Sequence, residues 1–97
     1  MLPKLDPLLH SELRLAVISI LSGGESADFT FLRQQTGATA GNLSVQLEKL
    51  TAADYITVEK GFKGRKPCTT CRITPSGLEA FNAYIQALQA YLPGAQK

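Results

Sequence analysis

Four segments of the chain place apolar residues at the three- and four-residue spacing of a helix buried on one face. The first begins at Asp6, a good N-cap residue, and Pro7, which suits the first helical position because an N–H would be unpaired there. It ends at the Gly–Gly pair of residues 23–24, since glycine readily adopts the left-handed cap conformation. The residues expected to face inward are Leu9, Leu13, Ala16, Val17 and Ile20.

The second predicted helix is short and covers residues 29–36, with Ser26 or Asp28 as its cap. Gly37 ends it, and a brief turn leads to a third helix over residues 40–52. Two helices joined by a turn containing glycine are typical of a helix-turn-helix. The residues expected inside are Phe29, Leu32 and, as an open alternative, Phe31 from the second helix, and Leu43, Leu47 and Leu50 from the third.

A β-hairpin is predicted next, because two β-rich runs, YITVEKGF and TTCRIT, flank a Gly- and Pro-containing loop. We expect this hairpin to have a long tip. Thr74 and Pro75 then begin a fourth helix that extends to about residue 91. Three helices, a hairpin and a final helix predict a mainly α fold with a β-hairpin, the winged helix-turn-helix architecture.

Charge is distributed unevenly over these segments. The 97 residues carry a net charge of +2, but residues 56–74 hold five cations and one carboxylate, a net +4. A basic patch on a nearly neutral chain indicates a polyanionic partner such as nucleic acid, although a solvated basic loop is the alternative.

The length predicts a single domain over residues 1–97. The longest apolar run, residues 15–21, is too short to cross a membrane, and residues 1–9 lack signal-peptide features, so we expect a cytoplasmic protein.

Several stretches, in this order, resemble the small stand-alone winged-helix DNA-binding domains of MarR- and ArsR-like regulators: LDPLLHSELRLAVISIL, FTFLRQQTG, GNLSVQLEKL, DYITVEKGFKGRKP and T-x-x-x-I-T-P-S-G. GNLS-x-x-L-x-x-L and GRKP are the most specific of them. The resemblance implies a dimeric transcriptional regulator that binds duplex DNA. Gln46 stands where relatives often carry histidine, which leaves the operator sequence open.

The outward face of the third helix supplies the candidate DNA-reading residues. Asn42 and Gln46 could each make a bidentate contact to adenine, and Val45 could pack on a thymine methyl group. Thr39 and Ser44 suit phosphate contacts, as does the helix N-terminus itself. The alternative is that Thr39 only caps the helix and that the other polar residues are solvated. Two more charged residues are expected on this face, Glu48 and Lys49.

The basic hairpin completes the predicted DNA-binding surface. Glycines permit a tight tip, and Pro67 is expected to end it. An arginine in a narrow minor groove would read its shape. The candidate DNA contacts of the hairpin are Lys60, Lys63, Arg65 and Lys66.

Cysteine and histidine offer little chemistry. Cys68, Cys71 and the distant His10 cannot fill a four-ligand zinc site. Three extended residues span about 10 Å, so the two cysteines are too far apart for a disulfide; we expect Cys71 in the core and Cys68 near the loop, where a redox switch is the open alternative. His10 and Arg14 are four apart, which suits a polar pair or a contact with a partner helix. There is no catalytic set, phosphate loop or cofactor motif, so the chain is not expected to be an enzyme.

The fourth helix carries an apolar seam with alternating three- and four-residue spacing. We expect residues 75–92 to form a dimer interface, which would place two recognition helices about 34 Å apart. The alternative is that this helix closes the monomer's own core. A small-molecule effector, if there is one, would have to lie at the dimer interface between the first and last helices. A winged-helix protein-interaction module without DNA binding is the second functional reading. The predicted dimerisation residues are Leu78, Phe81, Tyr84, Ile85, Leu88, Tyr91 and Leu92.

Overall fold

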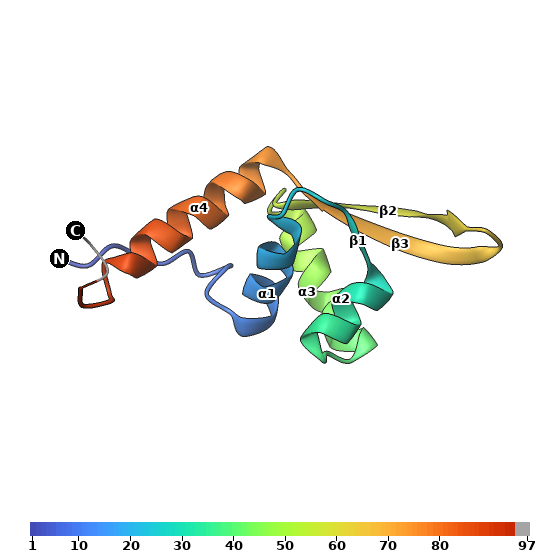
Figure 1. The fold of residues 1–97 in the computed structure, drawn as a ribbon, viewed down its shortest axis with the longest axis horizontal. Coiled ribbons are helices and arrows are strands. Elements are labelled where there is room, and N and C mark those ends of the chain that lie inside the picture. The colour runs from blue at the N-terminus through green and yellow to red at the C-terminus, as the bar shows by residue number, and fades with distance from the viewer. Residues whose placement is uncertain (95–97) are drawn as a thin grey trace.

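A computed structural model describes residues 1–94 of the chain. Three helices pack beneath the inner part of a small sheet, while a long hairpin projects from one end and the last helix from the other (Figure 1). The molecule is correspondingly elongated, with extents of 53 × 25 × 22 Å. The predicted winged-helix architecture is confirmed. The elements are α1 (Glu12–Leu21), β1 (Ala27–Asp28), α2 (Phe29–Thr36), α3 (Ala40–Ala52), β2 (Ile56–Lys63), β3 (Lys66–Ile73) and α4 (Pro75–Gln89).

Side-chain caps start three of the helices where the sequence places them. The carboxylate of Asp28 accepts a hydrogen bond from the backbone N–H of Phe31 at 2.7 Å, which makes Asp28, and not Ser26, the cap of α2. Thr39 and Thr74 cap α3 and α4 in the same way. Gly37 ends α2 with a φ of 71°, a left-handed conformation that favours glycine.

The first helix begins later than predicted. α1 starts at Glu12 after an extended Ser11, and Asp6 instead organises a separate turn. The Asp6 side chain accepts from the backbone N–H of Leu8 at 2.9 Å, and its carbonyl accepts from His10 at 2.8 Å. A side chain that bonds the nearby backbone stabilises a turn in place of a helix. The prediction that the first helix begins at Asp6 is therefore wrong.

The hairpin differs from the prediction at its tip. β2 and β3 pair antiparallel as far as Lys63 and Lys66, so the tip is a two-residue turn and not a long loop. Its first residue, Gly64, has a φ of 67°, as the first position of a type II′ hairpin turn requires. Pro67 does not end the tip but lies within β3, opposite Phe62. β1 pairs with β3 only near Thr70, so β3 has a single neighbour beyond that point and a proline is tolerated there.

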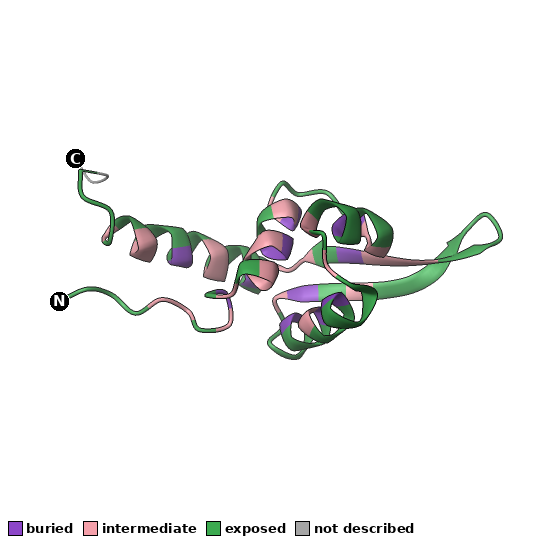
Figure 2. Ribbon diagram, turned by 90° about the horizontal axis from the view of Figure 1, so that it is seen from below, coloured by how far each residue is buried: buried purple, intermediate pink, exposed green. Residues whose placement is uncertain are grey.

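The buried residues gather where the helices meet the inner ends of the strands (Figure 2). The three predicted leucines of α3 are all buried, together with Leu32 of α2 and Ile56 of β2. Phe31, left open as an inward-facing residue, is exposed. The distal half of the hairpin is exposed on both faces because no helix covers it. Within residues 1–94, no helix has the length and apolar character needed to cross a membrane.

Candidate nucleic-acid interface

Helix α3 has one buried side and one open side, as predicted. Its leucine stripe is buried, whereas the side chains of Asn42, Ser44 and Lys49 lie exposed to solvent. Val45 is also exposed, with 48% of its surface accessible, although an isolated valine gains nothing from facing water. The capping residue Thr39 is exposed as well. The N-terminal half of α3 therefore presents small polar groups and one apolar group on an accessible helix face.

A chain of hydrogen bonds orders two of these side chains. Thr39 Oγ1 accepts from the backbone N–H of Asn42 at 3.1 Å. Asn42 Oδ1 accepts from Gln46 Nε2 at 3.0 Å, and Gln46 Oε1 accepts from Arg14 of α1 at 2.5 Å. Gln46 is half-buried, unlike the other candidate residues of α3. It is the innermost of the predicted base-reading residues, and its oxygen already has a protein partner.

The cations of the hairpin lie on two faces. Residues opposite one another in register share a face, so Lys63 and Lys66 lie together on one side, and Lys60 lies on the other. Arg65 occupies the two-residue tip. All four are exposed. The predicted basic cluster is thus real as a surface feature, but Lys60 alone belongs to the face that looks toward α3.

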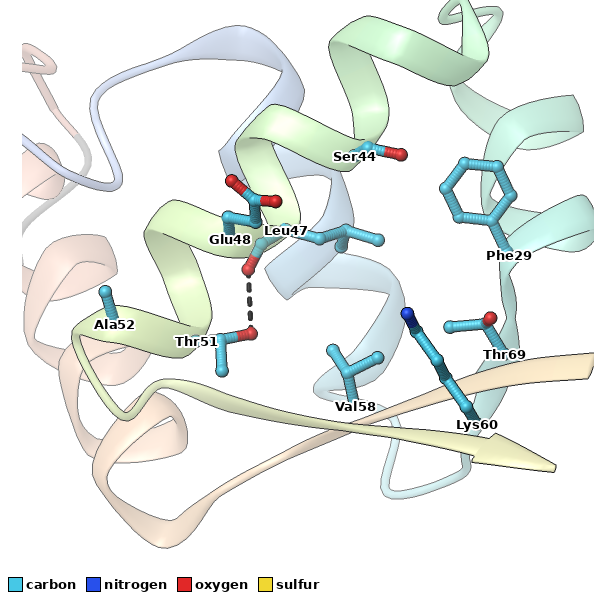
Figure 3. Close-up of a pocket in the computed structure, with 9 residues that line it drawn as sticks. All are labelled: Phe29, Ser44, Leu47, Glu48, Thr51, Ala52, Val58, Lys60 and Thr69. Atoms are coloured by element: carbon cyan, nitrogen blue, oxygen red, sulfur yellow. Dashed lines mark hydrogen bonds between the residues drawn. The ribbon is translucent and has the colours of Figure 1, made fainter.

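A groove of about 750 Å³ separates the hairpin from α3. Figure 3 shows Val58 and Lys60 extending from β2 toward α3, with Glu48 on the helix across the groove. Ser44 also lines the groove. The open side of α3 and the basic hairpin are consequently neighbours across this groove.

An exposed aromatic residue on the hairpin was missed by the sequence reasoning. Phe62 is 76% accessible and lies on the same face as Lys60, opposite Pro67. Its even spacing from Ile56 and Val58 resembles a continuation of the core face. The long reach of the strands beyond the helices, which the sequence did not reveal, is what leaves this side chain in solvent.

The predicted dimer seam of α4 is divided in the structure. Tyr84 is only 4% accessible and is hydrogen-bonded to His10 Nδ1 at 3.0 Å, so it belongs to the monomer's own core and is not part of an open surface. Phe81 and Leu88 are half-buried. Four of the seven predicted residues are exposed: Leu78, Ile85, Tyr91 and Leu92.

The polar pair proposed on the first helix does not form. His10 lies in the turn before α1 and contacts Tyr84 of α4, whereas Arg14 bonds the carbonyl oxygen of Leu8 and the side chain of Gln46. Both residues make structural contacts within the chain.

The two cysteines occupy opposite faces of β3, as predicted. Cys71 is buried opposite Val58. Burial, with a smaller contribution from the charge of Asp28, raises the pKa of the Cys71 thiol to about 11. Cys68 is half-exposed and is a free thiol, as is Cys71.

A helix-turn-helix whose second helix is open on one side, beside a projecting basic hairpin, defines a winged helix-turn-helix domain. The chain belongs to the winged helix DNA-binding domain family, whose model matches residues 13–92.

The chain is also similar to a curated relative and to proteins of known structure. The chain is 33% identical over 79 residues to an uncharacterized protein of Methanocaldococcus jannaschii, covering 80% of this chain and 85% of that protein. Its fold is similar to that of a transcriptional regulator homologue from Pyrococcus horikoshii OT3, with a TM-score of 0.83, 24% identity and coverage of 93% and 89% of the two chains. It is also similar in fold to smu.1704 of Streptococcus mutans UA159, with a TM-score of 0.71, 17% identity and coverage of 94% and 86%.

Proposed function

We propose that residues 1–97 act as one unit, a sequence-specific transcriptional regulator that binds duplex DNA as a homodimer and represses by occluding its site. The observation that carries the proposal is the open polar side of α3 next to the basic hairpin. The major groove of DNA is wide enough to admit such a helix. Family membership and the fold shared with a transcriptional regulator homologue support the same function.

In this arrangement the N-terminal half of α3 enters the major groove. Asn42 reads base edges and Val45 packs against a thymine methyl group, while Thr39 and Ser44 bond phosphate oxygens. Gln46 contributes from a deeper position because it is half-buried. Lys49 lies nearer the C-terminal end of the same helix and neutralises the charge of a DNA phosphate.

The hairpin contacts the neighbouring backbone or minor groove. Lys60, Lys63, Arg65 and Lys66 are solvated and free to release counterions from the phosphates. Phe62 adds an apolar side chain that the edge of a groove can cover. Glu48 lines the same groove as Lys60, from the α3 side.

The homodimer rests on the apolar residues that α4 leaves in solvent. Leu78 and Ile85 lie on α4, and Leu92 lies three residues beyond its end at Gln89; the three are seven residues apart and all are exposed. Figure 1 shows α4 extending away from the helical body, so a second copy can approach it. A two-fold pairing of this kind presents two copies of α3 to successive turns of one DNA face.

The test is selection of bound sequences from a random duplex pool, followed by salt titration of the selected site. We expect an approximately palindromic consensus and an affinity that falls linearly with salt on logarithmic axes. No preference among duplexes, with no binding at low salt, would contradict the proposal. Capture of a protein partner through α3 under those same conditions would favour an interaction module instead.

A further inference from the structure

Arg14 is fixed between the N-terminal turn and the recognition helix. Its Nε donates to the carbonyl oxygen of Leu8 at 2.6 Å, and its Nη1 donates to Gln46 Oε1. Arg14 and Gln46 are both half-buried behind the open face of α3. A guanidinium holds its donors in a rigid planar fork, so two acceptors at different positions hold the whole group in one orientation.

This contact determines which way the Gln46 amide points. A guanidinium carries donors only, so the group turned toward Arg14 has to be the amide oxygen. The Gln46 NH₂ group then lies toward Asn42, whose Oδ1 accepts from it at 3.0 Å. The Asn42 oxygen is thereby turned toward the helix, which leaves its NH₂ group as the donor that faces outward.

We propose that Arg14 is a positioning residue for base recognition, which sets the donor and acceptor pattern of Asn42 and Gln46 without touching DNA itself. The inference rests on the proposed function, because it assigns regulation of specificity to a residue outside the reading face. With both amide oxygens engaged inside the protein, the outward groups are NH₂ donors, which pair with base acceptors such as purine N7 or guanine O6. Ordering the two amides before binding removes part of the entropic cost of ordering them on DNA.

The experiment compares the Arg14→Met and Lys4→Met variants, both of which lose one positive charge. Lys4 is exposed and lines a pocket with Glu79 and Ala83 of α4, and no residue of α3 lines that pocket. Affinities are measured for the selected duplex and for a scrambled duplex of equal length, and circular dichroism confirms that each variant is folded. We expect Arg14→Met to lower the preference for the selected duplex roughly three- to tenfold, with unchanged affinity for the scrambled one. Lys4→Met should leave the preference intact.

Two results separate positioning from direct contact. If Arg14 bound a phosphate, Arg14→Met would reduce the salt slope by about one and weaken both duplexes alike, which would overturn the proposal. In a double-mutant cycle, Arg14→Met and Gln46→Leu should each lower the preference, and the double variant should lose little more than either. Additive losses would show that the two residues act separately and would also overturn it.

A measurement without DNA makes the inference independently falsifiable. Side-chain amide NMR signals of Asn42 and Gln46 should report ordered groups in the wild type, in contrast to the exposed Gln86 of α4. They should become mobile in Arg14→Met. Amides as mobile as Gln86 in the wild type would overturn the positioning role even if the protein selects DNA. Absence of any duplex preference alongside ordered amides would overturn the proposed function and, with it, the specificity role.

Discussion

The hydroxyl of Tyr55 donates a hydrogen bond to the carboxylate of Asp6 at 2.6 Å, although 49 positions separate the two residues. The contact ties the N-terminal turn to the chain just before β2. Acceptance by Asp6, then burial, then the negative charge of Asp6 raise the pKa of Tyr55 to about 12 from its usual 10. The folded protein therefore holds the Tyr55 proton more tightly than the unfolded chain does.

The pH dependence of stability follows from the sign of this shift. The Tyr55 contribution to the free energy of unfolding is complete below pH 10 and is lost as the pH rises from 10 to 12. Titration of tyrosinate absorbance should show that Tyr55 ionises late. Asp6→Asn should bring that tyrosine back toward its usual pKa, whereas Glu25→Gln, at an exposed carboxylate, should leave it late. Absence of a late-ionising tyrosine in the wild type would contradict the assignment.

Gly77 is required where α4 meets the chain before β2. A Cβ atom at this position would lie 2.1 Å from the carbonyl oxygen of Tyr55 and 2.9 Å from Cγ1 of Ile73. Because the first of these is backbone, relief requires movement of the main chain, and we expect Gly77→Ala to lower the free energy of unfolding by about 1–3 kcal/mol or more. Gly41→Ala is the control, since a Cβ there meets nothing within 4 Å. Urea denaturation followed by circular dichroism measures both, and equal stabilities would refute the steric argument.

Charge reversal at the tip of the hairpin should weaken DNA binding without changing its sequence preference. Arg65→Glu removes one phosphate-neutralising group and adds a repelling carboxylate, so affinity should fall for every duplex and the salt slope should become smaller. Lys4→Glu makes the same change in net charge at the opposite end of the molecule. Titration of both variants against the selected and scrambled duplexes tests this. Equal losses in the two variants would indicate a general charge effect and not a hairpin contact.

The two thiols should differ in reactivity. Cys68 is half-exposed, whereas Cys71 is buried and its raised pKa keeps it protonated at neutral pH. Mass spectrometry after brief alkylation should find one modified thiol in the native protein and two in denaturant. Cys68→Ser should abolish the native reaction, and modification of Cys71 in the folded Cys68→Ser variant would contradict its placement.

Helix α4 provides the test of dimerisation. Ile85→Asp places a charge in the exposed apolar row and should shift the protein toward monomer, because a carboxylate in an apolar interface loses its hydration. Gln86→Asp changes an exposed neighbour on the same helix and should not. Sedimentation velocity over a range of concentrations distinguishes the outcomes. A wild type that stays monomeric at high concentration would remove the basis of the homodimer.

Local interactions were readable from the sequence. The caps Asp28, Thr39 and Thr74 each bond a backbone N–H three positions ahead. Residue type and place before an apolar run predicted Thr39 and Thr74, and narrowed the cap of α2 to Ser26 or Asp28. The leucines of α3 were predictable because helical periodicity depends only on spacing. The open side of α3 follows from the same periodicity.

The tertiary structure decided what depends on residues far apart in the chain. Tyr84 lies beside the predicted a/d seam and widens its apolar stripe, but its contact with His10, 74 positions away, assigns it to the monomer core. The length of the hairpin depends on strand pairing beyond the helices, which no local pattern encodes. The orientation of Gln46 depends on Arg14, 32 positions earlier. The sequence by itself therefore determined which helices form and which side of α3 is buried, because those preferences act within a few residues. Only the tertiary structure decided the partners of Tyr84 and Gln46, because these partners lie far away in the chain.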